Sequence, residues 1–361
     1  MKLGLMLSYS GARLSLPLEL VAAAERLGFD SVWTAETYGS DALSPLAFLA
    51  AHTRDLRLVT GVMQLAGRTP ANCAMAVQTI DALAGGGRVV AGVGVSGPQI
   101  VEGWYGQPWG KPYYRLRDYV TIMRKIFARE EPVTHGGREI ALPYAGPGST
   151  GMGKPLKSIL HPNPALPIWL GTDSESMVKL TAEIADGWIP FRFVPETMPT
   201  YLPWLQEGFR RARTGKSLAD FEIFAETDVV LSDDVAAGFD YLRPKVALYV
   251  GGMGHRDKNY SKDHMSRLGF AEDAERIQEL FLAGRKAEAA AAVPDEYCDA
   301  RALVGPASRI RRRYADWQAS GITGLTIRPN GLHVLPVIAE IAGLRPRPNT
   351  PAMDHATGLR R

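Results

Sequence analysis

Arg88-Val-Val-Ala-Gly-Val-Gly-Val-Ser-Gly-Pro-Gln99 joins an apolar run directly to a turn of glycine and serine. Pro167-Ile-Trp-Leu-Gly-Thr-Asp-Ser-Glu-Ser176 repeats this order further along the chain. In both stretches a predicted strand ends where backbone N–H groups and hydroxyls are available, which is the chemistry that binds an anionic group. The pair therefore predicts a site for an anionic ligand at the carboxyl ends of two strands.

Around these stretches, strand-like and helix-like segments alternate along most of the chain. Strands are expected at residues 3–7, 31–34, 56–65, 89–95, 168–170, 188–191, 222–231 and 324–328. Helical patterns are found at 18–27, 45–53, 70–83, 113–129, 176–185, 196–213 and 307–319. Proline near the start and glycine just past the end are typical of such helices. Eight strands joined by helical crossovers predict an α/β protein with a (β/α)8 TIM barrel.

We expect one barrel domain over residues 1–344, because barrels of this length commonly form a single domain. Two stretches break the alternation: residues 131–166 are rich in Gly, Pro and Ser, and residues 244–305 carry extra helical signal. In a barrel such stretches are insertions in the loops, where substrate walls are built. Residues 345–361, rich in Pro, Arg and Thr, are expected to be poorly ordered.

Composition excludes several classes of function for the 361 residues. The formal net charge is only +3 and no long block of like charge occurs, so nothing indicates nucleic acid binding. Two cysteines and seven histidines show no metal-binding spacing, and we expect no metal. No apolar run suits a membrane span or a signal peptide. With few cysteines, the chain is expected to be cytoplasmic.

Three short motifs suggest other activities but lack the context that those activities need. Residues 92–97 match GxGxxG, yet Pro98 follows at once and three predicted strands precede the motif, which disfavours a Rossmann site. Residues 148–154 match GxxxxGK, but Pro155 replaces the Ser or Thr that a P-loop needs for magnesium. The first turn also lacks the last glycine of GxSxG, which argues against an esterase.

An ordered set of segments resembles the bacterial luciferase-like family of barrels, which bind FMN or the deazaflavin coenzyme F420. The segments are Lys2-Leu-Gly-Leu-Met6, Ala22-Ala-Ala-Glu-Arg-Leu-Gly-Phe-Asp-Ser-Val-Trp33 with Glu36, Arg57-Leu-Val-Thr-Gly-Val62 with Arg68-Thr-Pro70, Asp81-Ala-Leu-Ala-Gly-Gly-Gly-Arg88, Gly92-Val-Gly94 and Ala185-Asp-Gly-Trp188. They span roughly residues 1–330, in the order of the expected strands. No single segment is decisive, but the ordered set is specific.

Residues 81–88, 94–99, 101–106 and 148–154 are most similar to the actinobacterial F420-dependent branch. The resemblance implies an F420-dependent oxidoreductase that transfers a hydride between C5 of the deazaflavin and a carbonyl, imine or activated alkene carbon of a small organic substrate. Two alternatives stay open: an FMN-dependent monooxygenase, and a non-catalytic protein that carries F420 or a flavin. The resemblance also implies a homodimer.

The resemblance implies a cofactor ring at the mouth formed by the strand carboxyl ends. A non-prolyl cis peptide at Gly61-Val62 would press on the ring face, and an ordinary strand glycine is the alternative. The phosphate and ribityl chain would be held at two strand ends, by Ser96, Gly97, Gln99, Gly171, Thr172 and Asp173. Asp173 equally suits capping of the next helix. Arg68 and Lys154 would attract an anionic tail.

Glu36, which ends the second strand, is the candidate catalytic residue, to orient substrate or to move a proton. A solvated or ion-paired carboxylate is the alternative. Thr37 stands where the family's sugar-phosphate dehydrogenases place a histidine, which argues against glucose-6-phosphate oxidation and makes Thr37 a candidate substrate contact. Flat apolar walls for the substrate are expected from Trp104, Tyr105 and Trp109, with simple loop packing as the alternative.

Overall fold

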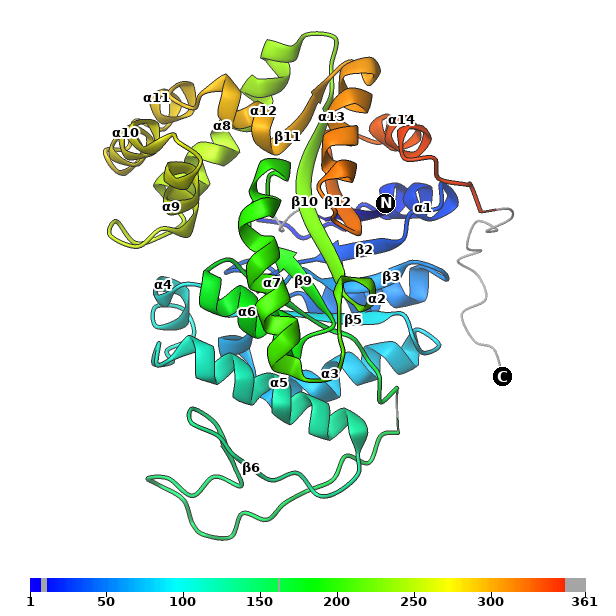
Figure 1. The fold of residues 1–361 in the computed structure, drawn as a ribbon, viewed down its shortest axis with the longest axis vertical. Helices are drawn as coiled ribbons and strands as arrows, with labels where there is room; N and C mark the ends of the chain where they lie inside the picture. Colours follow the sequence, from blue (N-terminus) through cyan, green and yellow to red (C-terminus); the bar gives the residue numbers. More distant parts are fainter. Residues whose placement is uncertain (8–11, 162, 348–361) are drawn as a thin grey trace.

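The computed structural model describes residues 1–7, 12–161 and 163–347, and within them the sheet closes into a barrel of eight parallel strands (Figure 1). The strands are β1 (Lys2–Met6), β2 (Ser31–Thr34), β3 (Arg57–Thr60), β5 (Val89–Gly94), β8 (Ile168–Thr172), β9 (Gly187–Pro190), β10 (Glu222–Leu231) and β12 (Gly324–Pro329). Each pairs with the next, and β12 pairs with both β10 and β1, which closes the ring. The predicted (β/α)8 barrel is confirmed.

Helices surround the barrel, and in the following set all but the last lie where the 3.6-residue pattern predicts them; the sequence predicted no helix at residues 334–341. They are α1 (Leu18–Arg26), α2 (Leu43–His52), α3 (Pro70–Leu83), α5 (Pro112–Ala128), α6 (Glu175–Ile184), α7 (Met198–Ala212), α13 (Ala307–Ala319) and α14 (Val334–Ile341). The start of α3 shows why a boundary is clear in the sequence: Pro70 takes the first helical position, and Thr69 Oγ1 accepts a hydrogen bond from Asn72 N at 3.2 Å.

The barrel interior is filled by a tight group of aromatic rings. The ring centroids of Trp33, Trp169 and Phe224 lie 5.1 to 5.6 Å apart, and all three side chains are almost fully buried. Above them Gly92 is required, because a Cβ there would lie 1.7 Å from the carbonyl oxygen of Thr60. The interior is therefore a packed core, and any ligand must lie at one end of the barrel.

The third predicted strand, residues 56–65, is interrupted. β3 ends at Thr60, and β4 (Met63–Gln64) resumes the pairing with β5 after a bulge at Gly61 and Val62. The peptide bond between Gly61 and Val62 is cis, as the resemblance led us to expect.

A group of helices lies outside the barrel after β10 (Figure 1, upper left). It contains α8 (Val235–Gly251), α9 (Tyr260–Arg267), α10 (Ala271–Leu282), α11 (Lys286–Ala291) and α12 (Asp295–Arg301). These helices share a hydrophobic core of their own, which includes Leu242, Met265 and Ile277. The sequence placed residues 244–305 in a helical insertion and missed β11 (Ala302–Gly305), which pairs in parallel with the far half of β10.

Residues 131–161 and 163–166 form a long excursion that extends away from the other insertion (Figure 1). Its regular structure is a hairpin of β6 (His135–Gly136) and β7 (Ala141–Leu142). Of the expected tail, Arg347 is described and its backbone N–H donates to the carbonyl of Arg26, whereas residues 348–361 lie outside the described residues. No helix in the described part of the chain combines the length and apolar character needed to cross a membrane.

Candidate active site

Three strand ends meet at the carboxyl end of the barrel around the side chain of Val62. A Cβ on Gly94, at the end of β5, would lie 2.5 Å from Val62 Cγ2, and one on Gly171, in β8, would lie 2.9 Å from Val62 Cγ1. The Val62 side chain of the bulge after β3 therefore packs directly against Gly94 and Gly171, where no larger residue would fit without a shift. The two turns that the sequence predicts to bind an anion lie side by side, since Gly94 and Gly171 are register partners.

The turn after β5 places its residues in conformations that suit close approach of a ligand. Ser96 has a left-handed backbone with φ of 60°, and α4 (Pro98–Val101) begins directly after Gly97. The Gln99 side chain folds back over Gly97, where its Oε1 would lie 2.4 Å from an added Cβ. Gln99 Nε2 donates to the carbonyl of Met253 at 2.9 Å, so this amide binds a neighbouring segment.

The turn after β8 differs from expectation in one side chain. The Thr172 hydroxyl is 2.8 Å from Thr181 Oγ1 on α6 and is buried, so only the backbone of Thr172 is available at the mouth. Asp173 accepts a hydrogen bond from Tyr201 Oη at 2.8 Å and forms an ion pair with Arg267. Ser174 rather than Asp173 occupies the N-cap position of α6. The negative charge of Asp173 is thus compensated from two sides.

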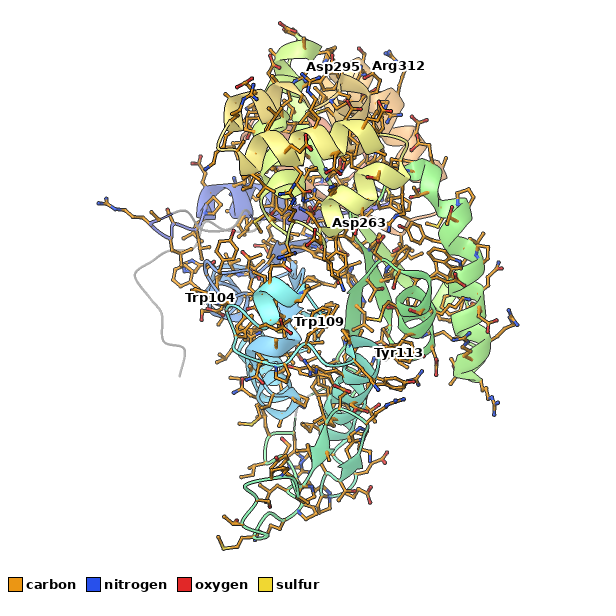
Figure 2. The ribbon with its side chains drawn as sticks, turned by 90° about the vertical axis from the view of Figure 1, so that its left-hand side faces the viewer. Trp104, Trp109, Tyr113, Asp263, Asp295 and Arg312 are labelled. Carbon is orange, nitrogen blue, oxygen red and sulfur yellow. The ribbon has the colours of Figure 1, made fainter. Side chains whose placement is uncertain are left out.

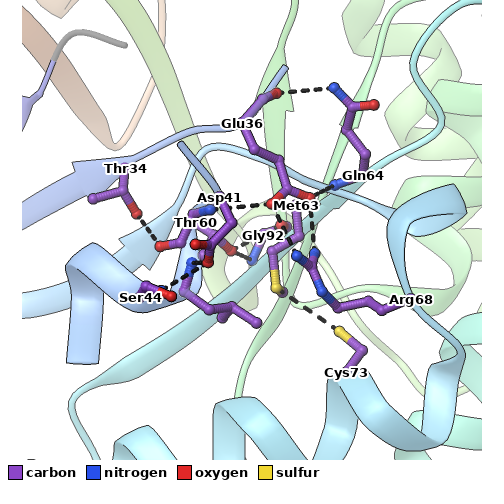
Figure 3. A network of polar contacts seen from close by, with 12 residues as sticks. Thr34, Glu36, Asp41, Ser44, Thr60, Met63, Gln64, Arg68, Cys73 and Gly92 are labelled. Atoms are coloured by element: carbon purple, nitrogen blue, oxygen red, sulfur yellow. Dashed lines mark hydrogen bonds and ion pairs between the residues drawn. The ribbon is translucent and has the colours of Figure 1, made fainter. Parts of the chain in front are cut away.

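Glu36 is held in a dense network just after β2 (Figure 3). Its Oε1 accepts from Gln64 N at 2.7 Å and its Oε2 from Ala42 N at 3.0 Å. The Arg68 guanidinium binds both oxygens, at 2.7 and 3.0 Å. Of the two interpretations of Glu36, the ion-paired carboxylate describes this geometry.

The guanidinium group of Arg68 is held by its ion pair with Glu36. Burial alone would lower the pKa of Arg68, but the hydrogen bonds and the charge of Glu36 raise it above its ordinary value. The expected pull of Arg68 on an anionic tail is offset by the carboxylate beside it. Lys154, the other expected cation, is exposed on the 131–166 excursion.

The three aromatic residues after β5 have different surroundings. Trp104 is 61% exposed and lies 6.4 Å from the Tyr38 ring, centroid to centroid. Tyr105 packs on Gly67, next to Arg68, and burial raises the pKa of its hydroxyl. Trp109 is half-buried, with Lys258 Nζ 5.4 Å from its ring centroid. Thr37 is half-buried beside Glu36.

Residues 253–267, here called the bridging segment, connect the helical insertion to the barrel mouth. Figure 2 shows α9, which carries Asp263, above the turn that carries Trp109. The segment contacts four loops: Met253 contacts Tyr38 after β2 and Gln99 after β5, and Lys258 lies over Trp109. Arg267 binds Asp173 after β8, and Ser261 binds Arg192 after β9. Several residues expected to bind ligand therefore lie next to one segment.

Charged residues at the remaining strand ends were missed in the sequence. They are Arg192 after β9, Glu226 and Asp228 on β10, Arg328 on β12, and Lys245 and Arg301 from the insertion. A charged residue at the carboxyl end of a barrel strand is a functional signal, and it could have found the first four. A cavity of about 230 Å³ borders the ends of β1, β2 and β12 and is lined in part by Ala35 and Arg328. No cluster of metal-binding side chains occurs in the described residues.

Fold and site together define a (β/α)8 barrel whose carboxyl end presents Val62 packed on two glycines, two turns of glycine and hydroxyl residues, and charged side chains. The sequence model of the luciferase-like monooxygenase family matches residues 1–324, and the chain belongs to this family of enzymes.

Individual relatives support the same assignment. The chain is 48% identical over 91% of its length, and 94% of the relative's, to a protein of Mycobacterium tuberculosis described as "Putative coenzyme F420-dependent oxidoreductase". A coenzyme F420-dependent tetrahydromethanopterin reductase from Methanopyrus kandleri shares the fold with a TM-score of 0.78 at 20% identity, covering 95% of this chain and 99% of that one. An F420-dependent secondary alcohol dehydrogenase shares it with a TM-score of 0.71 at 18% identity, covering 94% and 97%.

Proposed function

We propose that this protein is an F420-dependent oxidoreductase that transfers a hydride between C5 of the deazaflavin and a carbonyl, imine or activated alkene carbon of a small organic substrate. The observation that carries the proposal is the 48% identity, over nearly the whole chain, to a relative with this description. When bound, F420 would supply the carbon that gives or accepts the hydride. The protein would supply position, a shielded face and charge placement.

The residues at the mouth fit a flat ring with an anionic tail. Because Gly94 and Gly171 have no side chain, Val62 can pack against both strands at the barrel mouth. The bulge would then offer its apolar side chain to a ring. The backbone of Ser96, Gly97 and the β8 turn would hold the tail. Asp173 would repel an anion if it were free, but Arg267 and Tyr201 compensate its charge.

Glu36 is proposed as a positioning residue rather than as a proton donor or acceptor. Both of its oxygens are occupied by Arg68 and by two backbone N–H groups, which leaves no open site toward a substrate. Through Gln64, which belongs to β4, the carboxylate fixes the strand that follows the Gly61–Val62 bulge. Glu36 would therefore influence hydride transfer indirectly, by fixing the position of the Gly61–Val62 bulge, which with Gly94 and Gly171 is called the floor of the site.

Cofactor titration tests the proposal. Purified protein is titrated with F420 and, separately, with FMN, and quenching of cofactor fluorescence is followed. We expect saturable binding of F420. Tight FMN binding without a response to F420 would replace the proposal with a flavin monooxygenase. Binding of F420 without oxidation of its reduced form by a panel of carbonyl and enone compounds would indicate a carrier.

A matched pair of glycine variants locates the cofactor. In Gly171→Ala the new Cβ would lie 2.9 Å from Val62 Cγ1, so we expect the floor to shift and F420 binding to weaken about tenfold. Gly136→Ala, in the β6–β7 hairpin, is the control, because its Cβ would have no neighbour within 4 Å. Equal F420 affinity in both variants would place the cofactor elsewhere.

The family resemblance also supports a homodimer, and the two cysteines support a reducing compartment such as the cytoplasm. Cys73 and Cys298 are free and buried, and burial raises the pKa of each thiol to about 11, which suits cysteines with no redox task. Light scattering coupled to gel filtration measures the oligomeric state directly, and a monomeric mass would exclude the homodimer.

A further inference from the structure

A group of basic and hydroxyl side chains lies where the helical insertion meets the barrel mouth, with Ser261, His264 and Tyr297 buried and Arg192 and Arg301 half-buried. The group, here called the basic cluster, consists of Arg192, Ser261, His264, Tyr297 and Arg301. Arg192 Nε donates to Ser261 Oγ at 3.0 Å, and Ser261 precedes His264 by one turn of α9. The Arg301 guanidinium lies 5.5 Å from the ring centroid of Tyr297, one turn before it on α12.

The basic cluster carries more positive charge than its surroundings neutralise. Two acids lie nearby, but Asp228 binds Lys245 at 2.7 Å and Glu226 forms an ion pair with Arg328. Among the described residues, neither Arg192 nor Arg301 has a carboxylate within 4 Å. Arg192 and Arg301 are half-buried, and two partly desolvated guanidinium groups without a counter-ion are unfavourable, a cost that an anionic ligand would reduce.

The pKa of Arg192 changes in the direction expected for an uncompensated cation. Burial, and then the charge of Arg301, lower the pKa of the Arg192 guanidinium to about 10. Arg57, at the opposite end of the barrel, has carboxylate partners and shows the opposite direction: its pKa is raised, because Glu222 and Asp30 outweigh the effect of burial.

Two further members of the basic cluster have polar atoms without a partner. His264 is 2% exposed, and neither ring nitrogen makes a hydrogen bond in the described structure. The hydroxyl of Tyr297, which is fully buried, likewise has none. Buried polar groups are nearly always hydrogen-bonded, so these atoms indicate a missing partner. A neutral imidazole, a phenol and two guanidinium groups can all donate hydrogen bonds to one acceptor.

The position of the basic cluster relates it to the reaction. Arg192 lies two residues beyond the end of β9, and Arg301 immediately precedes β11, beside β10. The proposed cofactor floor is built on β3, β5 and β8, and β9 pairs with β8. Cluster and floor thus occupy neighbouring sectors of one mouth. A cavity of about 10 Å³ is lined by Arg192, Arg301 and Lys245, and Asp228, which is the ion-pair partner of Lys245, lines it as well.

We propose that the basic cluster binds the carboxylate of an organic acid substrate, with Arg192 and Arg301 as its ionic partners and His264 and Tyr297 as hydrogen-bond donors. This inference rests on the proposed function, because the remainder of the substrate would face the hydride-transfer site. Planar guanidinium groups match the planar carboxylate, which can accept two parallel hydrogen bonds. The substrate class is therefore a carbonyl-bearing or unsaturated monocarboxylic acid.

Binding of matched acids and esters tests the cluster directly. The probes are short oxo and α,β-unsaturated monocarboxylates, each compared with its methyl ester, and the readouts are calorimetric affinity and thermal stabilisation of the protein with and without F420. We expect the best acid to bind at least about tenfold more tightly than its ester. Equal affinities of acid and ester across the series would overturn the proposal, as would stronger binding of inorganic phosphate.

Variants assign the effect to the cluster. Arg301→Gln and Arg192→Gln should each weaken the best acid about tenfold and leave the ester unchanged, whereas Arg301→Lys should keep part of the preference. Arg276→Gln, an exposed position on α10, is the control with the same change of charge. An acid affinity within twofold of the wild type in both glutamine variants would contradict the assignment.

The outcomes separate this inference from the proposed function. If F420 fails to bind but the acid preference is present and is lost in Arg301→Gln, the proposed function is wrong and the anion site is supported. If F420 binds and is turned over with neutral acceptors, while acids have no advantage, the proposed function holds and the basic cluster is not a carboxylate site.

Discussion

The two ends of the barrel differ in how completely their charged side chains are paired. At the amino-terminal end, Arg57 binds Asp30 and Glu222, each at 2.7 Å, and Lys2 binds the second oxygen of Glu222 at 2.9 Å. The Arg57 guanidinium also lies 5.1 Å from the ring centroid of Trp169, at the amino-terminal side of the aromatic core. At the carboxyl end, Arg192 and Arg301 have no such carboxylate among the described residues.

This difference matches the division of labour within barrels. Residues at the amino-terminal end stabilise the fold, and residues at the carboxyl end bind and react. A complete set of ion pairs suits the first task, because each charge keeps its partner permanently. Incomplete pairing suits the second, because a ligand then contributes the missing partner. Complete ion pairs also occur at the carboxyl end, where Arg68 binds Glu36, Arg267 binds Asp173, Lys245 binds Asp228 and Arg328 binds Glu226. Among the described residues around the basic cluster, the incomplete pairing is therefore confined to Arg192 and Arg301.

The largest effect is expected from breaking the amino-terminal ion pairs. Arg57→Leu would leave Asp30 and Glu222 partly buried without their common partner, and should lower the free energy of unfolding by about 3 kcal/mol. Chemical denaturation measures the change, and Arg54→Leu, at an exposed position, is the control. A loss no larger than that of the control would show that this end of the barrel does not depend on the pairs.

The Glu36–Arg68 pair at the carboxyl end should behave in the same way with a smaller effect. Glu36→Gln removes the charge that Arg68 binds and should cost about 2 kcal/mol of stability. If Glu36 acts by position, a double-mutant cycle with Arg68→Gln should show strong coupling in stability, and the turnover of both single variants should fall by similar factors. Turnover lost in Glu36→Gln alone, with stability intact, would restore a direct catalytic role.

Acidification below pH 6.5 should lower the stability of the folded protein through His264. Burial, together with the charges of Arg301, Arg267 and Arg192, lowers the pKa of His264 from 6.5 to about 3. Below pH 6.5 the unfolded chain binds a proton that the folded chain refuses, so stability falls as the pH decreases from 6.5 toward 3.

The test of this linkage is a comparison of two proteins over a pH range. Between pH 7 and pH 5, His264→Gln should lose about 2 kcal/mol less stability than the wild type, as measured by denaturation at each pH. The exposed His255 offers the matched control, His255→Gln. Parallel stability curves for wild type and His264→Gln would show that His264 takes up its proton normally in the folded protein.

The smallest effect is expected where a compensated charge lies beside the proposed anion site. Asp173→Asn removes the acidic partner of Arg267 and keeps a group that Tyr201 can bind. Because this ion pair is partly exposed, the loss of stability should be about 0.5 kcal/mol. Arg267 would then be released toward the cofactor tail, so F420 binding should become tighter, and more so at low salt. Weaker F420 binding in Asp173→Asn would mean that the carboxylate itself contacts the ligand.

The sequence located the barrel strands because each combines an apolar run with a clear turn. It missed β11, since the four residues Ala302–Gly305 follow a helix without any intervening turn signal. It also began the second insertion at residue 244, whereas α8 runs from Val235 to Gly251 with Pro244 inside it. Proline usually ends a helix, and in α8 tertiary packing outweighs that preference.

The site was predictable only as far as local geometry determines it. The turns after β5 and β8 and the bulge at Gly61 and Val62 could be found, because each depends on a few consecutive residues. The pairing of Glu36 with Arg68, 32 positions away, depends on how two loops meet in space. The hydroxyl of Thr172 was assigned to the ligand for the same reason: its partner Thr181 lies on the next helix. The basic cluster combines residues from 192 to 301, far beyond the reach of a motif.

Helix α9 has a consequence that extends to the order in which ligands enter. Ser261, His264 and Arg267 follow one another at intervals of three residues, the first two at the basic cluster and the third bound to Asp173 beside the cofactor turn. A ligand that binds at the basic cluster and a ligand that binds at the cofactor turn would therefore both act on helix α9. If cofactor binding changes the affinity for the substrate by some factor, substrate binding must change the affinity for the cofactor by the same factor.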